Sequence, residues 1–223
     1  MAGYLILGAG KFGRLALRRL ARQDAAARFT VVDRLPGALA AARAASGQDG
    51  QWVEAEAVRF LVERLDVGAA WDWIIPMTPV HLAFCWLLAG PLAGLGWQAA
   101  PAPEPLASLA PVARRGPQGE LYLSLAHHLC PDDCAEPEVC PVTGEPRELP
   151  LYRDLAAVPL PGWQIRVIES RQLAPGVGGY APERLRELAR DMDNLAGNLA
   201  IATACRCHGV VHGLTRPSGR HGV

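Results

Sequence analysis

The residues of this sequence best suited to chemistry are its cysteines. Three of the six, Cys130, Cys134 and Cys140, lie in residues 127–141, a loop-like segment that also holds two histidines and several prolines. Thiolates bind zinc and iron–sulfur clusters, and a loop stiffened by proline loses less entropy when its thiols converge. The spacing C-x3-C-x5-C matches neither a standard zinc finger nor a standard ferredoxin. We call residues 127–141 the cysteine loop and expect a metal or an iron–sulfur cluster there.

A further ligand for that site must come from another part of the chain or from the loop's histidines. Cys205 and Cys207 form a C-x-C pair near the end of the sequence. If the fold brings this pair against the cysteine loop, one of Cys205, Cys207, His127, His128 or His208 completes the site. Either an iron–sulfur cluster or zinc suits these donors, and buried free cysteines beside an exposed loop are the alternative.

A second candidate site lies near the N-terminus. The sequence there is Gly8-Ala9-Gly10-Lys11-Phe12-Gly13, which fits G-x-G-x-x-G. In this pattern Gly8 allows a tight turn, Gly10 lets a pyrophosphate approach the backbone, and Gly13 lets the following helix pack closely. The phosphates would bind the free N–H groups at the start of that helix, beside Lys11 and Phe12. We call residues 8–13 the glycine loop and expect it to bind a dinucleotide.

The elements needed to position the glycine loop are present around it. We expect a strand before it, a helix at 14–22, and a second strand at 29–32 that ends in Asp33. A carboxylate about 20 residues beyond the last glycine can accept hydrogen bonds from an adenosine ribose, which favours NAD. Arg34 could instead bind the 2′-phosphate of NADP, so both cofactors stay open.

Strands and helices continue to alternate beyond Asp33. We expect a helix at 36–46, a strand at 51–55, a helix at 57–65, a strand at 72–75 and a helix at 79–88. This alternation predicts a mostly parallel sheet whose ligands bind beyond the carboxyl ends of its strands. Thr78 would cap the last helix and border the cofactor. His81 would donate a hydrogen bond or act as an acid–base catalyst, or it would be an ordinary packing histidine.

The second half of the sequence is less regular. A segment rich in proline, glycine and alanine follows residue 89, so we divide the chain into a dinucleotide-binding domain, 1–105, and a smaller subdomain, 106–223. We expect a last strand of the first sheet at 97–100, further strands at 121–125, 163–169 and 209–214, a loop at 174–180 and a long helix at 182–205. The predicted fold class is α/β, with a Rossmann-like mostly parallel sheet followed by a smaller α+β subdomain that contains the cysteine loop.

Composition excludes several classes of function. The formal net charge is zero, which argues against a broad surface for nucleic acid or anionic membranes. No apolar run approaches the ~20 residues needed to span a membrane, and the N-terminus enters a strand without a signal peptide. We therefore expect a cytoplasmic protein that does not insert directly into membranes. Its partner would be a small-molecule substrate or electron acceptor, and a homo-oligomer or a partner protein stays open.

The first ~90 residues, with the glycine loop and the Val-Val-Asp-Arg sequence at 31–34, resemble the Rossmann NAD-binding superfamily. They are most similar to the NAD-binding regulatory domains of potassium-uptake transporters and to the dehydrogenase domain of precorrin-2 dehydrogenases. This resemblance implies dinucleotide binding at Gly8, Gly10, Gly13 and Asp33. The second half matches neither family.

Two hypotheses from different classes follow. The first is an NAD(P)-dependent oxidoreductase with a Cys-ligated metal or iron–sulfur site. The alternative is an NAD(H)-sensing regulatory module with a structural zinc site.

Overall fold

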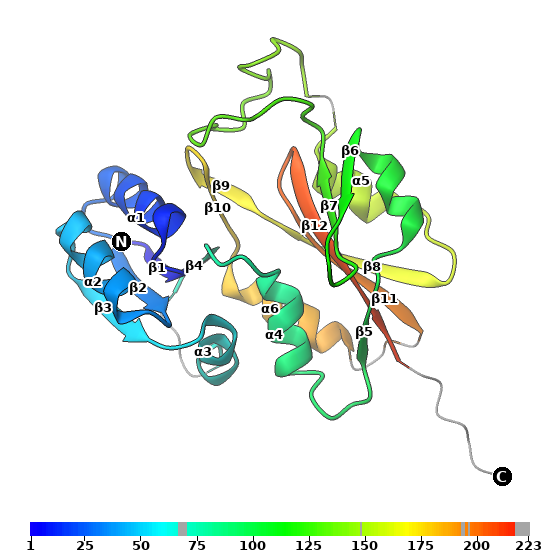
Figure 1. The fold of residues 1–223 in the computed structure, drawn as a ribbon, viewed down its shortest axis with the longest axis horizontal. Coiled ribbons are helices and arrows are strands. Elements are labelled where there is room, and N and C mark those ends of the chain that lie inside the picture. Colours follow the sequence, from blue (N-terminus) through cyan, green and yellow to red (C-terminus); the bar gives the residue numbers. More distant parts are fainter. Residues whose placement is uncertain (67–70, 148, 193–194, 196, 217–223) are drawn as a thin grey trace.

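Two larger β-sheets and a two-stranded hairpin, with helices between and around them, make up the described part of the structure (Figure 1). The computed structural model describes residues 1–66, 71–147, 149–192, 195 and 197–216. None of the helices in this described part of the chain is long and apolar enough to cross a membrane.

The first sheet is parallel, with the strand order β3-β2-β1-β4. Its elements alternate along the chain as β1 (Gly3–Leu7), α1 (Lys11–Gln23), β2 (Arg28–Asp33), α2 (Pro36–Ser46), β3 (Gly50–Glu54), α3 (Ala57–Arg64), β4 (Trp73–Pro76) and α4 (Leu82–Ala89). The order is that of the first half of doubly wound nucleotide-binding sheets. The predicted α/β class is therefore confirmed.

The strands of this sheet are apolar because helices cover both of its faces. Every residue of β1 is buried, as expected of a central strand in a parallel sheet. Helices α1 and α2 pack on one face, where Leu17 and Leu39 join a buried cluster. Helices α3 and α4 pack on the other face through Leu61 and Leu87. This layering fixes the ends of β1, β2 and β4, from which the glycine loop and its neighbours extend.

The second sheet has the order β6-β7-β12-β11-β8, and β5 pairs with β12 beside this path. The elements that follow α4 along the chain, of which β9 and β10 form a separate two-stranded sheet, are β5 (Gln98–Ala100), the 3-10 helix η1 (Glu104–Leu109), β6 (Val112–Arg115), β7 (Leu121–Ser124), α5 (Leu151–Ala157), β8 (Trp163–Glu169), β9 (Arg171–Ala174), β10 (Val177–Gly179), α6 (Pro182–Asp191), β11 (Asn198–Ala204) and β12 (His208–Thr215). Strands β8 and β11 are parallel, and the other pairs are antiparallel. The strands predicted at 121–125, 163–169 and 209–214 are confirmed. The strand predicted at 97–100 exists, but its place in the first sheet is wrong, because β5 pairs with β12.

The helix predicted at 182–205 is wrong over its second half. Helix α6 ends at Asp191, and Asn198–Ala204 form strand β11. Gly197 stands between them with a φ of 90°, a conformation that favours glycine. Strand β11 is paired on both edges and almost wholly buried, so its run of apolar residues belongs to a central strand despite alanine's low strand propensity. The predicted helix also includes residues 193, 194 and 196, which lie outside the described residues.

One apolar cluster joins the two sheets. Helices α4 and α6 lie between the sheets, and Leu7 of the first sheet, Leu87, Leu188 and Ile201 of the second sheet belong to the same buried cluster. On the far face of the second sheet, α5 and η1 cover a separate cluster that includes Ala202. The division of the chain at residue 105 stays a prediction.

The hairpin of β9 and β10 connects the first sheet to the cysteine loop. Residues 174–180, predicted as a loop, include strand β10, which pairs with β9. Beyond β10, the Tyr180 and Ile74 backbones exchange hydrogen bonds of 2.8 and 3.1 Å. The hairpin is thus attached to the edge strand β4 (Figure 1).

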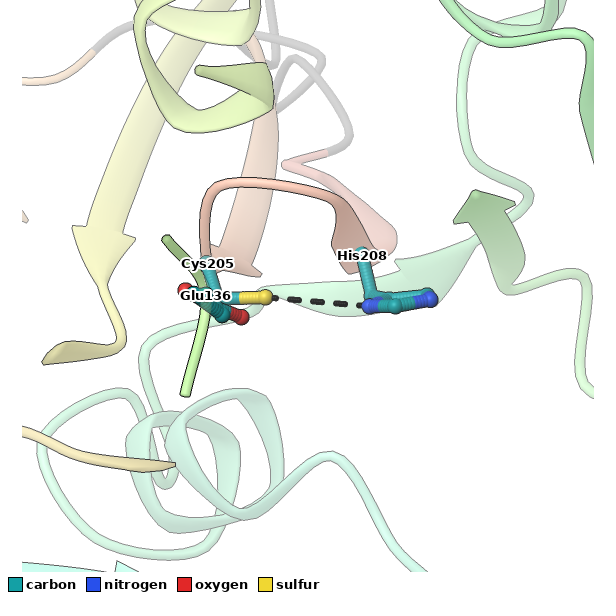
Figure 2. A group of neighbouring side chains, drawn as sticks. All are labelled: Glu136, Cys205 and His208. Carbon is teal, nitrogen blue, oxygen red and sulfur yellow. Dashed lines mark hydrogen bonds between the residues drawn. The ribbon is translucent and has the colours of Figure 1, made fainter. Parts of the chain in front are cut away.

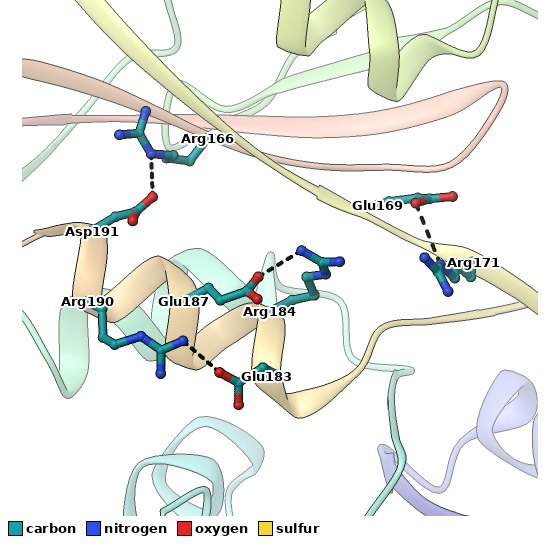
Figure 3. Close-up of polar contacts among 8 residues, drawn as sticks. All are labelled: Arg166, Glu169, Arg171, Glu183, Arg184, Glu187, Arg190 and Asp191. Atoms are coloured by element: carbon teal, nitrogen blue, oxygen red, sulfur yellow. Dashed lines mark hydrogen bonds and ion pairs between the residues drawn. The ribbon is translucent and has the colours of Figure 1, made fainter.

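Ion pairs line the outer side of α6 and connect it to β8 (Figure 3). They are Glu183 with Arg190 at 2.6 Å, Arg184 with Glu187 at 2.7 Å and Asp191 with Arg166 of β8 at 2.7 Å. Exposed pairs of this kind contribute about 0–1 kcal/mol each. The position of α6 therefore depends mainly on its buried face, which includes Leu185 and Leu188.

Candidate functional site

The glycine loop connects β1 to α1 at the carboxyl edge of the parallel sheet. Gly8 has a φ of 109°, and a Cβ there would overlap the carbonyl oxygen of Met77. A Cβ on Gly13 would overlap the carbonyl oxygen of Gly8. In contrast, a Cβ on Gly10 would meet no atom of the described residues within 4 Å. Packing therefore requires glycine at positions 8 and 13, whereas Gly10 borders open space at the start of α1.

The groups around this space fit a dinucleotide. Gly10 is the N-cap of α1, and no side chain of the described residues caps that helix, so its first N–H groups can bind phosphate. Lys11 and Phe12 are exposed beside it. The Asp33 carboxylate accepts hydrogen bonds from the N–H groups of Ala9 at 2.7 Å and Leu35 at 2.9 Å.

Those two hydrogen bonds fix the Asp33 carboxylate next to the glycine loop. Each carboxylate oxygen can accept a further bond, so a ribose hydroxyl could still bind. The Arg34 side chain is exposed just beyond β2. Its place permits contact with a 2′-phosphate, and the choice between NAD and NADP stays open.

Thr78 and His81 lie after β4, but not in the predicted helical positions. Helix α4 begins at Leu82 with His81 as its N-cap residue, so Thr78 does not cap it and His81 is not in its first turn. The Thr78 hydroxyl is buried and has no hydrogen-bond partner among the described residues. Thr78 lines a cavity of about 440 Å³ at this edge, together with His81 and Tyr180.

His81 is buried between α4 and the second sheet. Its Nδ1 lies 3.0 Å from Nδ1 of His212, and its Nε2 lies 2.9 Å from the Thr203 hydroxyl. Burial, with a smaller effect from the charge of His212, lowers the pKa of His81 to about 3, so the ring is neutral. The ring of Phe84 stacks on His212 with 4.1 Å between the ring centroids. Both His81 nitrogens are thus already engaged, and its catalytic role stays a prediction.

Four cysteines from two distant segments lie near one another. Burial raises the pKa of Cys130, and negative charge on Cys134 and Cys140 raises it further. Burial likewise raises the pKa of Cys207, and charge on Cys130 and Cys134 adds to the effect. Cys130, Cys134 and Cys207 line one cavity, and Sγ of Cys130 and of Cys140 both lie within 3.8 Å of Nε2 of His128. We call Cys130, Cys134, Cys140 and Cys207 the thiol cluster.

Several hydrogen-bond donors face the thiol cluster. The backbone N–H groups of Thr143 and Val142 lower the pKa of Cys140 to about 6. The Arg147 guanidinium lies 3.7 Å from Sγ of Cys134. Nε2 of His128 is 3.7 Å from Sγ of Cys140 and 3.8 Å from Sγ of Cys130. Donors of this kind stabilise thiolates, the form of cysteine that binds metals.

Cys205 belongs to a different group. Its Sγ lies 3.9 Å from Nδ1 of His208, and Glu136 of the cysteine loop approaches from the other side (Figure 2). Burial raises the pKa of the Cys205 thiol to about 12, and the negative charge of Glu136 contributes. Cys205 and Cys207 thus line one cavity, but Cys205 lies beside Glu136 and His208.

The C-x-C pair lies in the hairpin turn between β11 and β12. The helix predicted at 182–205 would have placed it at a helix end, and that prediction is wrong. The two ends of the segment that carries the cysteine loop are attached to this turn. Leu125 donates its N–H to the carbonyl of Cys207 at 2.9 Å, and Leu151 donates to the carbonyl of Arg206 at 2.8 Å. These bonds bring cysteines far apart in the sequence to one place.

The cysteine loop is also held against the first sheet. Arg19 of α1 forms an ion pair of 3.1 Å with Asp132. Gly176, at the tip of the β9–β10 hairpin, donates its N–H to the carbonyl of Cys134 at 2.9 Å. A Cβ on Gly176 would overlap the carbonyl oxygen of Asp132, so the two backbones touch there.

These contacts make the glycine loop and the thiol cluster face a common space. A cavity of about 390 Å³ is lined on one side by Phe12, Pro76 and Met77 and on the other by Cys134, Cys207 and His208. We call it the shared cavity. A dinucleotide bound at the glycine loop and a metal held by the cysteines would both border it.

Sequence reasoning missed two charged residues of this region, Glu136 and Arg147. Nothing in their local sequence sets them apart from other exposed charges of the same segment. The C-x2-H spacing from Cys205 to His208 was a usable signal, because short Cys/His spacings are typical of metal sites. The overlapping C-x-C pair obscured it.

The fold and the site define an α/β protein in which a glycine loop faces a cluster of cysteines. Residues 70–217 match the family AF_1314_C, described as "Uncharacterized protein, C-terminal domain", and the chain belongs to this family. The match includes β4, the whole second sheet and both cysteine groups. A protein from Archaeoglobus fulgidus, described as "Uncharacterized protein", is 27% identical over 226 residues, which cover 95% of this chain and 99% of the relative.

Proposed function

We propose that this chain is a cytoplasmic NAD(P)-dependent oxidoreductase whose thiol cluster holds a metal or iron–sulfur centre beside the dinucleotide. The observation that carries the proposal is the shared cavity, lined by both the glycine-loop side and the cysteine side. Its volume of about 390 Å³ lies in the range of small-molecule sites. A nicotinamide and a small substrate would meet there.

The dinucleotide half of the proposal rests on the geometry of the glycine loop. The phosphates would bind the uncapped N–H groups of α1, where Gly10 leaves open space. Asp33 would accept bonds from the adenosine ribose. The unpartnered hydroxyl of Thr78 would serve the nicotinamide half of the cofactor. Hydride would pass from the nicotinamide to an electrophilic carbon of the substrate, and a proton would complete the reduction.

The metal half of the proposal rests on the thiol cluster and its hydrogen-bond donors. Tetrahedral zinc with Zn–S distances of about 2.3 Å holds its sulfurs about 3.8 Å apart. Among the described residues, no three ligand atoms of the thiol cluster lie within 4.8 Å of one another. We favour an iron–sulfur cluster over a single zinc ion because an electron acceptor beside a nicotinamide is chemically useful. Such a centre would exchange single electrons with an acceptor.

The first test compares two glycine variants in a titration with NADH and NADPH. Gly10→Ala places a methyl group where the phosphates would approach, so we expect affinity to fall by about tenfold or more. Gly37→Ala is the matched control, because a Cβ there also meets no described atom within 4 Å. Equal affinity in both variants and the wild type would remove the dinucleotide from the proposal.

The second test identifies the metal. Protein purified without oxygen would be analysed for iron, sulfide and zinc, and its visible spectrum recorded with and without a reductant. We expect iron and sulfide in the wild type and their loss in Cys140→Ser. Bound zinc, no colour and no turnover of NAD(P)H would contradict the proposal and make the chain a dinucleotide-sensing module.

A further inference from the structure

We infer that Glu136, Cys205 and His208 form a second metal site, separate from the thiol cluster, that binds one Zn²⁺ or a similar divalent cation. Figure 2 shows the carboxylate, thiol and imidazole converging from the cysteine loop and the β11–β12 turn. The site shares no ligand with the thiol cluster, which it adjoins, and it does not require the dinucleotide.

The spacing of the three side chains suits a single ion. One ligand atom from each lies within 4.8 Å of the other two. Ideal tetrahedral zinc, with Zn–S about 2.3 Å and Zn–N about 2.1 Å, places sulfur and nitrogen about 3.6 Å apart. The observed distance from Sγ of Cys205 to Nδ1 of His208 is 3.9 Å. Small side-chain movements would therefore complete the coordination.

The backbone of Glu136 is held in an unfavourable conformation that aims its side chain at the site. Glu136 has a φ of 52°, and among the described residues it is the one non-glycine residue with a positive φ. Such a conformation persists only where surrounding contacts impose it, and it is commonest at functional sites. The Arg206 N–H donates to the Glu136 carboxylate at 3.4 Å, which directs that carboxylate toward the turn.

A cation would also complete the charge balance. Within the described part of the chain, no Arg, Lys or His nitrogen lies within ion-pair distance of the half-buried Glu136 carboxylate. The Glu136 carboxylate accepts a hydrogen bond from the Arg206 N–H at 3.4 Å and lies beside Cys205 and His208. One divalent cation bound by the Cys205 thiolate and the Glu136 carboxylate would neutralise the charge of both groups in this partly buried place.

The turn presents Cys205 and His208 as ligands are presented in known metal sites. The Cys205 N–H donates to the His208 carbonyl at 2.8 Å, which closes the turn and places both side chains beside each other. With Nδ1 of His208 on the metal, its Nε2 lies 3.7 Å from Sγ of Cys130. A ligating histidine commonly donates its second N–H to a neighbouring group, which fixes its tautomer.

The site leaves a coordination position open. Cys205 and His208 line the shared cavity and a second cavity of about 440 Å³, which is also lined by Tyr122 and Tyr180. Three protein ligands with a fourth position open to a cavity are typical of catalytic zinc, whereas structural zinc usually has four protein ligands. The fourth ligand would be water or the oxygen of a small molecule.

The test measures how many divalent metal ions each chain binds, and it measures the affinity for Co²⁺ by titration of the whole chain. Co²⁺ bound to one thiolate gives a charge-transfer band and visible d–d bands. We expect Glu136→Gln and His208→Gln to weaken binding of this one ion by about tenfold or more while leaving the thiol-cluster metal in place. Cys140→Ser should do the reverse. Glu138→Gln is the control, because this neighbouring carboxylate is exposed.

Two results would overturn the inference. One is the complete loss of Co²⁺ binding in the Cys140→Ser variant, since all the metal bound by the wild type would then belong to the thiol cluster. The other is unchanged affinity in both Glu136→Gln and His208→Gln. Because the assay does not involve NAD(P)H, failure of the oxidoreductase proposal would leave this result intact, and failure here would leave dinucleotide binding untouched.

Discussion

The glycine loop and the thiol cluster border the same cavity, but their geometries arise in different ways. The glycine loop takes its shape mainly from its own residues, since Gly13 in the first turns of α1 packs on the carbonyl of Gly8, although Gly8 also packs on Met77. The thiol cluster joins a long loop to a hairpin turn more than 60 residues away and depends on α1 and the β9–β10 hairpin to hold that loop. Local sequence therefore specifies the first, and tertiary contacts specify the second.

Among the variants that test this difference between the two regions, we expect Gly176→Ala to have the largest effect on stability and on the cysteine loop. The residue has a φ of 65°, and its Cβ would overlap the backbone of Asp132. Strain and overlap together should lower the free energy of unfolding by roughly 2–4 kcal/mol and release the cysteine loop. Chemical denaturation would measure the first effect. The rate at which a thiol reagent modifies Cys134 would measure the second.

Gly47→Ala is the matched control for that variant. Gly47 has a similar φ of 61° after α2, but no described atom lies within 4 Å of its Cβ position. Only the conformational cost of about 1 kcal/mol should appear, with no change in thiol reactivity. If the two variants were equally destabilised, the contact between hairpin and cysteine loop would not matter to the site.

The same contrast explains what the sequence could predict. The helix at 36–46 and the strand at 163–169 were predicted with the bounds the structure shows, because periodic apolar residues and flanking Pro or Gly define them locally. The glycine loop was located for the same reason. In each case the signal and the structure occupy the same short segment.

Predictions failed where burial by distant elements decides the structure. The apolar residues before Cys205 fit a helix by periodicity, yet β11 lies between β8 and β12 and is covered on both faces. The convergence of the cysteines was expected, but the separation of Cys205 from Cys207 was not. Alternate residues of a tight turn point in different directions, and only the structure shows what each one meets.

A second prediction concerns the junction between the two sheets, where His81 is buried and neutral. Its folded pKa of about 3 is below its unfolded value, so the unfolded chain binds a proton first as the pH falls. The contribution of His81 to the free energy of unfolding is fully present above pH ~6.5. It decreases toward pH ~3 by up to about 1.4 kcal/mol per pH unit. His81→Gln should show a shallower loss of stability between pH 6 and pH 4 than the wild type.

His127→Gln is the control for the pH experiment, because it makes the same replacement at an exposed histidine. Urea denaturation at a series of pH values would give the slopes. Parallel slopes for His81→Gln and the wild type would mean that His81 takes up its proton in the folded state near its ordinary pKa. The junction would then be open to water, and a catalytic role for His81 would gain support.

The smallest effect is expected from Arg166→Ala, which removes the 2.7 Å ion pair between β8 and Asp191 at the end of α6 (Figure 3). Both side chains are partly exposed, so we expect a loss of at most about 1 kcal/mol, reduced further by salt. Leu188→Ala, on the buried face of the same helix, should cost about 2–5 kcal/mol. Thermal denaturation at low and high salt would compare them. A larger loss for Arg166→Ala than for Leu188→Ala would mean that surface charge, and not the apolar cluster between the sheets, holds the second sheet against the first.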